Sequence, residues 1–337
     1  MDDRKLKILA AVVDEYILTG EPVGSKAIMQ YIEASSATIR NEMAELEKQG
    51  YLEQPHTSAG RVPTYAGYRL YVDRLLKTNP ISTAEKRRLN KMLQESDYSE
   101  SALVETAQNA LAELTNCAVF ASGENPKFSV ISKVEVIPTG KRIYVLLMVT
   151  STGKIQNRTC RLELDLTHEQ LKYFSDFVKE NLEGVPLEVL SDEMLSQLET
   201  ALGTYLLTLS PLMKGIFDMS KEIAKRDVSL SGERHLLKCS EMNQSEIISF
   251  LDNSQELRHL IDDGFSGIHV TFSQEADGFV IGNSSLISSN FSKDGVVAGH
   301  LGVIGPMRIN YKKVIPYLEY LTDKITKMLS SQESDEE

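Results

Sequence analysis

The stretch that decides the fold of this chain reads Ser35-Ser36-Ala37-Thr38-Ile39-Arg40-Asn41-Glu42-Met43-Ala44-Glu45-Leu46-Glu47. Ile39, Met43 and Leu46 follow one another at intervals of four and three residues, which predicts a helix with one buried stripe. A serine at its start can cap it by accepting a backbone N–H, and Gly50 is expected to end it. The opposite face carries alanines among short polar groups, so another surface can approach it closely.

The segments before this helix complete a three-helix plan. Residues 5–18 have helical periodicity, and Gly20 with Pro22 should end that first helix. A short second helix is expected from Ser25 to Tyr31. Three helices joined by tight connections are typical of the helix-turn-helix, in which the last helix enters the major groove of DNA.

A hairpin is expected after the third helix. Tyr51 to Pro55 can form a strand and Val62 can begin its return, with a small, polar and cationic tip at residues 56–61. Such a tip has the form of a wing that touches phosphates or the minor groove. A fourth helix is expected after Thr64. The pattern alone also allows a small helical domain that binds protein, so both interpretations stay open at this point.

Several runs of this sequence resemble one protein family. They are residues 21–26, 35–47 and 50–64, and a further run at residues 299–308 extends the resemblance to nearly the full length. The last run reads Gly299-His300-Leu301-Gly302-Val303-Ile304-Gly305-Pro306-Met307-Arg308. The chain resembles the HrcA family, the bacterial heat-inducible transcription repressors.

The resemblance implies an α+β fold with three parts. They are an N-terminal winged helix-turn-helix domain, a GAF-like α/β domain, and an inserted helical dimerisation domain that splits the GAF-like domain in two. The expected boundaries are 1–78 for the winged helix, 79–100 for a linker, 101–165 and 233–329 for the GAF-like domain, 166–232 for the insert, and 330–337 for a disordered acidic tail.

The resemblance also implies a function. The protein would repress heat-shock chaperone operons by binding an inverted-repeat operator in double-stranded DNA as a homodimer. Heat would inactivate it, and a chaperonin of the GroE type would maintain its activity. The alternative is a ligand-sensing regulator whose GAF-like domain binds a small metabolite.

The resemblance marks the expected DNA contacts, each of which has a plainer structural alternative. Thr38, Arg40 and Asn41 are expected near bases, because arginine and asparagine side chains can pair with guanine and adenine edges. The remaining candidates are expected near phosphates or at the wing, and are Ser25, Lys26, Ser35, Ser36, His56, Thr57, Ser58 and Arg61. In the alternative, the serines cap a helix, Arg40 pairs with Glu47 or another acid on the surface, and His56 is an exposed loop residue.

The middle of the chain shows strands followed by helices. Strands are expected at residues 130–137 and 142–150, with a third that contains Ile155 and Leu164, and residues 167–226 are expected to be wholly helical. Within them, Pro211 should kink or end a helix near Ser210. An apolar seam there consists of Leu195, Leu198, Leu202, Tyr205, Leu209, Leu212 and Ile216. It can pack inside its own chain or form a dimer contact, and the resemblance favours the dimer.

Composition limits the remaining classes of function. The net charge of -12 excludes a wholly basic, histone-like protein, although residues 1–88 hold 13 Lys and Arg against 12 Asp and Glu. No stretch approaches the roughly 18 apolar residues of a membrane span, and no secretory signal is expected at the N-terminus. Three separated cysteines are expected to be reduced, which favours the cytoplasm.

No pattern of catalytic or cofactor chemistry is found. A phosphate-binding loop and a nucleophile motif are both missing from the sequence. His235 and Cys239 are spaced for one helix face, but two ligands without a second pair make a poor zinc site. Gly299, Gly302 and Gly305 are interpreted as turn and close-packing glycines. We therefore expect no enzyme activity, no cofactor and no bound metal.

Overall fold

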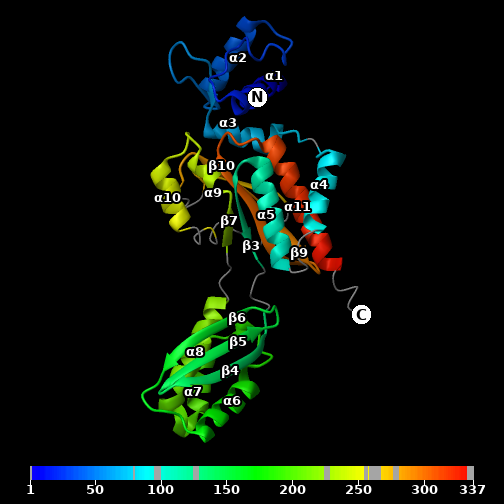
Figure 1. Ribbon diagram of the computed structural model, residues 1–337. Coiled ribbons are helices and arrows are strands. Elements are labelled where there is room, and N and C mark those ends of the chain that lie inside the picture. Colours follow the sequence, from blue (N-terminus) through cyan, green and yellow to red (C-terminus); the bar gives the residue numbers. More distant parts are fainter. Residues whose placement is uncertain are drawn as a thin grey trace. The chain divides into compact units, whose positions relative to one another are not determined.

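The chain forms two compact units in a computed structural model (Figure 1). Unit 1 comprises Met1–Gly123 and Val228–Glu337, and unit 2 comprises Glu124–Asp227. The structure describes residues 2–78, 80–94, 100–123, 129–223, 228–253, 257, 267–275 and 281–331. Helices and sheets occur in both units, so the fold is α+β as expected.

The N-terminal part of unit 1 is built on two helices. Helix α1 (Asp3–Thr19) is capped by Asp2 and ends at Gly20, whose φ of 69° is a left-handed conformation that glycine adopts without strain. Helix α2 (Ser36–Lys48) packs on α1 through its buried stripe of Ile39, Met43 and Leu46. The boundaries predicted for both helices are correct to within about two residues, because caps and stops act locally.

The second helix expected at residues 25–31 is not present as a helix. The segment is a succession of turns, held by bonds such as the one from the Ala27 N–H to the Gly24 carbonyl at 3.0 Å. These bonds link residues three apart, which is a tighter pattern than the α-helical one. A run of seven residues is too short to nucleate a helix by itself, and Ile28 is its only buried apolar side chain.

The predicted hairpin and the fourth helix are present. Strands β1 (Leu52–Glu53) and β2 (Val62–Pro63) pair antiparallel, and Thr64 caps α3 (Tyr65–Leu70). A π-helical turn, η1 (Tyr71–Leu75), continues α3. A Cβ atom placed on Gly67 would lie 2.2 Å from the Tyr51 carbonyl oxygen. Glycine therefore allows the start of α3 to contact the hairpin backbone.

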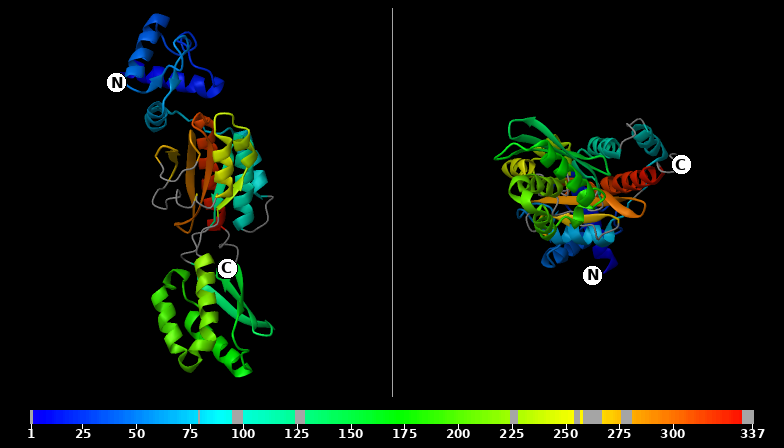
Figure 2. Two further views of the ribbon diagram at one scale, coloured as in Figure 1. Left: turned by 90° about the vertical axis from the view of Figure 1, so that its left-hand side faces the viewer. Right: turned by 90° about the horizontal axis from the view of Figure 1, so that it is seen from below.

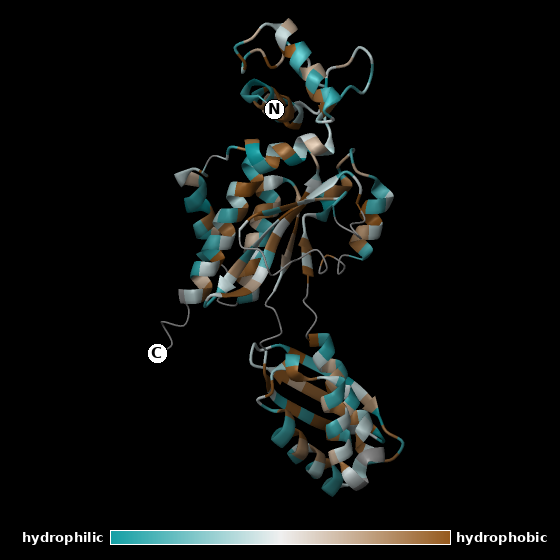
Figure 3. Ribbon diagram, turned by 180° about the vertical axis from the view of Figure 1, so that it is seen from behind, coloured by the Kyte–Doolittle hydropathy of each residue, from teal (hydrophilic) through white to brown (hydrophobic). Residues whose placement is uncertain are grey.

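The rest of unit 1 is an antiparallel sheet covered by helices on both faces. The order is β7-β3-β10-β9-β8. The strands are β3 (Ala118–Ser122), β7 (Val228–Ser231), β8 (His269–Phe272), β9 (Ser284–Lys293) and β10 (Val296–Pro306). The helices are α4 (Thr83–Gln94), α5 (Glu100–Thr115), α9 (Glu233–Leu237), α10 (Gln244–Asp252) and α11 (Tyr311–Ser331). Figure 3 shows apolar residues concentrated on the strands, while the surrounding helices carry hydrophilic residues as well.

The alternation of side chains along β3 creates two separate cores. Val119 and Ala121 belong to the cluster that includes α5 and α11, whereas Ala118 and Phe120 belong to the cluster beneath α9 and α10. Gly299 and Gly302 lie on the neighbouring strand β10, and added Cβ atoms there would meet the Phe291 and Phe120 rings at 2.4 Å and 2.2 Å. The interpretation of these two as close-packing glycines is confirmed.

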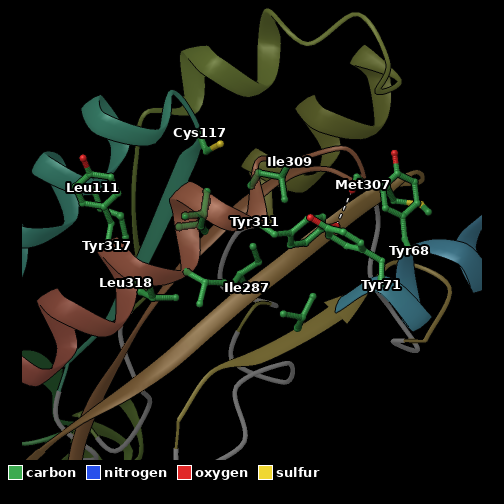
Figure 4. Packing of buried hydrophobic residues seen from close by; sticks show 14 of the residues in the cluster. Tyr68, Tyr71, Leu111, Cys117, Ile287, Met307, Ile309, Tyr311, Tyr317 and Leu318 are labelled. Atoms are coloured by element: carbon green, nitrogen blue, oxygen red, sulfur yellow. Dashed lines mark hydrogen bonds between the residues drawn. The ribbon is translucent and has the colours of Figure 1, made fainter. Parts of the chain in front are cut away.

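Aromatic rings join the N-terminal helices to this core. Tyr311 at the start of α11 is buried and donates a hydrogen bond to the Met307 carbonyl at 2.6 Å (Figure 4). Its ring centroid lies 6.4 Å from that of Tyr71. The Tyr71 hydroxyl in turn donates to the Asp14 carboxylate at 2.5 Å, and Lys312 contacts the same carboxylate at 2.7 Å. Asp14 on α1 is thus tied both to η1 and to α11.

Unit 2 is a three-stranded antiparallel sheet with helices on one face, as both Figure 1 and Figure 2 show. The strands are β4 (Ile131–Gly140), β5 (Ile143–Thr150) and β6 (Ile155–Arg161). The helices are α6 (His168–Leu182), α7 (Asp192–Ala201) and α8 (Leu206–Ile223), with short 3-10 turns at Leu187–Val189 and Gly203–Tyr205. The covered face of β5 carries Tyr144, Leu146 and Met148.

The opposite face of this sheet carries a row of apolar side chains, which we call the outer face. Ile143, Val145, Leu147 and Val149 alternate with the covered residues along β5, and none of them belongs to the buried cluster of unit 2. In the described part of the unit, every helix that packs on the sheet contacts its other side. A row of this kind on a central strand is unusual for a surface exposed to water.

Several expectations about the middle of the chain are wrong. The strands at residues 131–161 were assigned to the GAF-like domain, but they pair only with one another and lie in unit 2. The inserted segment is therefore Glu124–Asp227 rather than 166–232, and it contains a sheet. The expected linker at 79–100 contains helix α4, whose Leu89 and Leu93 are buried in the core of unit 1.

The helical part of the insert also differs from the sequence-based prediction, at the apolar seam and at Pro211. The apolar seam packs inside its own chain: Leu198, Leu202, Leu209, Leu212 and Ile216 are buried in the unit 2 core, with Leu195 and Tyr205 against it. These side chains are therefore not available for a contact with a second chain. Helix α8 runs through Pro211 without ending, because this proline is the sixth residue of the helix and removes a bond near its start.

At the C-terminus, α11 extends to Ser331, and the rest of the predicted tail lies outside the described residues.

Candidate nucleic-acid interface

The exposed face of α2 is narrow and carries two side chains that can read bases. Arg40 and Asn41 are both exposed, whereas the preceding Ile39 is fully buried. Ala37 and Ala44 occupy positions on the accessible side, so few atoms project there besides the polar groups. The face therefore has the width and the donor groups that a major-groove contact requires.

The hydroxyl groups at the start of α2 are engaged with one another. Ser35 is the N-cap: its Oγ accepts the Thr38 N–H at 3.1 Å and lies 2.9 Å from the Thr38 hydroxyl. Ser25 is buried, and its Oγ is 2.9 Å from that of Ser36. These four predicted site residues hold the start of the helix in place. The capping alternative for Ser35 is confirmed.

The wing tip carries small polar side chains in the solvent. His56, Thr57 and Ser58 are all exposed. The tip is held from within by Gln54, whose side-chain amide donates to the Thr57 carbonyl at 3.0 Å and to the Ala59 carbonyl at 2.9 Å. Sequence reasoning missed Gln54, although an amide side chain at the base of a polar loop is suited to satisfy loop carbonyls.

Arg61 is oriented toward α2 and not toward the wing tip. Its Nε donates to the Glu47 carboxylate at 2.9 Å, and its side chain is only 16% exposed. Glu47, the first partner suggested for Arg40 in that alternative, bonds to Arg61 instead. Arg40 is thereby left exposed beside the wing.

A groove of about 450 Å³ runs between α2 and the wing, and we call it the helix–wing groove. Its lining residues are Val23, Gly24, Ser25, Lys26, Arg40, Met43, Gln54, Thr57, Ser58, Ala59, Gly60 and Arg61. Six predicted site residues meet there, whereas Ser35, Ser36, Thr38, Asn41 and His56 lie outside it. The described residues that line this groove include three cations and no carboxylate. Arg61 is paired with Glu47, so Lys26 and Arg40 are the cations that favour an anionic backbone here.

A second hollow of about 450 Å³ lies at the edge of the core sheet. It is lined by Asn109, Ala112, Glu113, Ser231, Gly232, Glu233, Arg234 and His235. Both signs of charge face it. The pKa of His235 is lowered by burial and by the neighbouring Arg234 and Lys238 cations, which favours its neutral form.

The described residues carry few features of other classes of site. No group of three or more His, Cys, Asp or Glu side chains that could hold a metal ion occurs among them. Burial raises the pKa of the Cys117 thiol to about 11, which keeps it in the unreactive thiol form. None of the helices in the described ranges has the length and apolarity needed to traverse a bilayer.

Known proteins are similar to this chain over nearly its whole length. The model of the HrcA protein C terminal domain matches residues 101–315. Proteins named heat-inducible transcription repressor HrcA from Acetivibrio thermocellus and Moorella thermoacetica are 32% and 34% identical to this chain. The first comparison covers 96% of this chain and 95% of the relative, and the second covers 98% of each.

A solved structure has the same fold. It is the crystal structure of a hypothetical protein, 24% identical in sequence, with a TM-score of 0.60 over 98% of this chain and 99% of that one. The identity and coverage of the named relatives, together with the family model that spans most of the chain, establish its kinship. The chain belongs to the HrcA family.

Proposed function

We propose that this protein represses transcription of heat-shock chaperone operons by binding an inverted-repeat operator as a homodimer. The observation that carries the proposal is the juxtaposition of the exposed Arg40 and Asn41 on α2 with the cationic helix–wing groove. The names of the relatives, which describe heat-inducible transcription repressors, support it.

In this proposal residues 1–78 act as a winged helix-turn-helix. The N-terminal half of α2 enters the major groove, where Arg40 pairs with guanine and Asn41 with adenine. Lys26 and the wing residues Thr57 and Ser58 contact phosphates of the adjoining backbone. The free N–H groups at the start of α2 favour the same negative charge.

The two parts of the chain that follow the N-terminal domain are the GAF-like domain and the dimerising insert in this proposal. We assign the five-stranded sheet domain of unit 1 as GAF-like and unit 2 as the dimerising insert. The outer face of unit 2, which runs along β5, is the candidate dimer contact. Pairing two such faces removes their apolar side chains from water. Two-fold symmetry then presents two identical α2 helices to inverted half-sites.

Heat and a chaperonin regulate the protein in this proposal. Heating unfolds the repressor and releases the operator, and a chaperonin of the GroE type in the cytoplasm restores the DNA-binding form. Family membership supports this step.

Operator binding should recover faster after a heat pulse when GroE-type chaperonin and ATP are added. Equal recovery with and without them would contradict the chaperonin step.

Asn41→Ala tests the reading helix. We expect operator affinity to fall by about 1–3 kcal/mol, with relaxed preference at one base position, because one paired base contact is lost. Binding to a panel of single-base operator variants measures both quantities. Lys48→Ala, at the exposed C-terminal end of the same helix, is the control. Unchanged affinity and preference in Asn41→Ala would exclude α2 as the reading helix.

Lys26→Ala tests the phosphate contact at the helix–wing groove. Affinity should fall similarly for all sequences, and the slope of log K against log salt should become shallower by about 1, since one fewer counterion is released. Lys7→Ala, which removes an exposed cation paired with Asp3 on α1, is the control. If the two variants have the same salt slope as the unmodified protein, Lys26 does not contact the backbone.

The metabolite-sensing alternative has a candidate place in the polar hollow beside α9. A thermal-shift screen of the full chain against small polar metabolites tests it. A ligand that raises the unfolding temperature and changes operator affinity would favour this alternative.

A further inference from the structure

Arg61 occupies a junction between three segments of the N-terminal part. Its side chain bonds to Glu47 on α2 at 2.9 Å. Its backbone N–H and carbonyl each bond to Val23, both at 2.9 Å. The wing is thereby connected to the reading helix through a side chain and to the segment before the turns through its backbone.

The neighbouring residues leave this junction little freedom. A Cβ atom on Gly60 would lie 2.4 Å from the Val23 carbonyl and 2.6 Å from the Pro22 carbonyl carbon, so two backbones touch here. The Gln54 amide bonds to two carbonyls of the tip. The tip is thus held by its own hydrogen bonds, and the Glu47–Arg61 pair adds a side-chain link between the wing and α2.

The charges of this pair compensate each other. Glu47 is 34% exposed and Arg61 16% exposed, so both lie partly out of the solvent. A guanidinium bonded to a carboxylate has less charge to offer a phosphate than the exposed Lys26 or Arg40 has. The expected DNA contact of Arg61 therefore conflicts with its surroundings.

We propose that Glu47 and Arg61 are positioning residues, which hold the wing at the angle to α2 that operator binding requires. Arg61 acts through Glu47 and not through a phosphate. This inference rests on the proposed DNA binding. It predicts that an acidic residue close to the DNA supports binding, which is the reverse of what repulsion from phosphates alone predicts.

A double-mutant cycle separates the two roles. We expect Glu47→Ala and Arg61→Ala each to weaken operator binding by about tenfold, and the double variant to be no weaker than either single one, because neighbouring residues that act as a unit are not additive. The salt slope of Arg61→Ala should equal that of the unmodified protein. The charge swap Glu47→Arg with Arg61→Glu should recover part of the affinity. Binding to a scrambled duplex should change little in every variant.

Several outcomes would overturn the inference. Tighter binding by Glu47→Ala, or a shallower salt slope in Arg61→Ala, would show that Arg61 contacts a phosphate. Additive losses would show that the pair does not act as a unit. Thermal unfolding of each variant accompanies the titrations, and Glu47→Gln replaces Glu47→Ala if the latter unfolds. Failure of the unmodified protein to bind any inverted repeat would instead contradict the proposed function itself.

Discussion

Leu147→Lys is expected to convert the protein into a monomer and to weaken binding to a two-site operator by about a hundredfold or more, because the second half-site contact is lost. Leu147 lies in the middle of β5 on the outer face, opposite Glu135 on β4 and Asn157 on β6. Pairing two outer faces would bury the new ammonium group. Its desolvation costs more free energy than burial of the apolar side chains supplies.

Mass measurement by light scattering and titration with one-site and two-site duplexes check this result. Leu164→Lys is the matched control, since it makes the same change at a leucine that is 64% exposed and lies outside the strands. The control should remain dimeric, and both variants should bind a single half-site equally. A dimeric Leu147→Lys protein would move the dimer contact away from the outer face.

Gly67→Ala should destabilise the N-terminal part by about 1–3 kcal/mol, as overpacking of a tight contact does. The added methyl group would lie 2.2 Å from the Tyr51 carbonyl oxygen, which itself accepts the Thr64 N–H at 3.1 Å. Moving that carbonyl disturbs the joint between the hairpin and α3. Alanine inside a helix is otherwise favoured over glycine by about 1 kcal/mol, so helix propensity alone predicts the opposite sign.

Chemical denaturation followed by the loss of helical signal measures the effect. Gly24→Ala is the control, because a Cβ atom there has nothing within 4 Å. The control should unfold at the same denaturant concentration as the unmodified protein. A Gly67→Ala protein of equal or higher stability would mean that the hairpin and α3 are not in contact at this point.

Local features of the sequence predicted the N-terminal part well. Three local signals determine α2: the cap at Ser35, the stop near Gly50, and the buried stripe of Ile39, Met43 and Leu46 between them. Hydrophobic spacing, caps and turns act over four residues or fewer, so a single sequence contains them. The turns at residues 25–31 are the exception, since tertiary contacts decide the conformation of so short a segment.

Pairing between distant segments was not predictable in the same way. The strands at 131–161 were recognised as strands, but alternation does not reveal which sheet a strand joins. Strand β9 was missed because serines occupy much of it, including Ser284 and Ser285, which are fully buried. Helix α4 buries only Leu89 and Leu93, so its sequence offers few apolar positions from which a packed helix can be predicted.

The sequence indicates a set of candidate residues more clearly than it indicates the contacts that each of them makes. Six of the expected residues meet in the helix–wing groove. Ser25, however, is buried against Ser36, and Arg61 is bonded to Glu47. Sequence spacing indicates which side chains share a surface, whereas the direction of a long side chain depends on partners fourteen residues away.

We propose that α2 reads inverted half-sites in the promoters of chaperone operons. Footprinting of the purified full chain on its own genomic DNA, before and after mild heating, tests it most directly. We expect two protected half-sites related by a two-fold axis, protection that disappears on heating, and equal weakening of both footprints in Asn41→Ala. Absence of protection at every inverted repeat at the lower temperature would contradict the account.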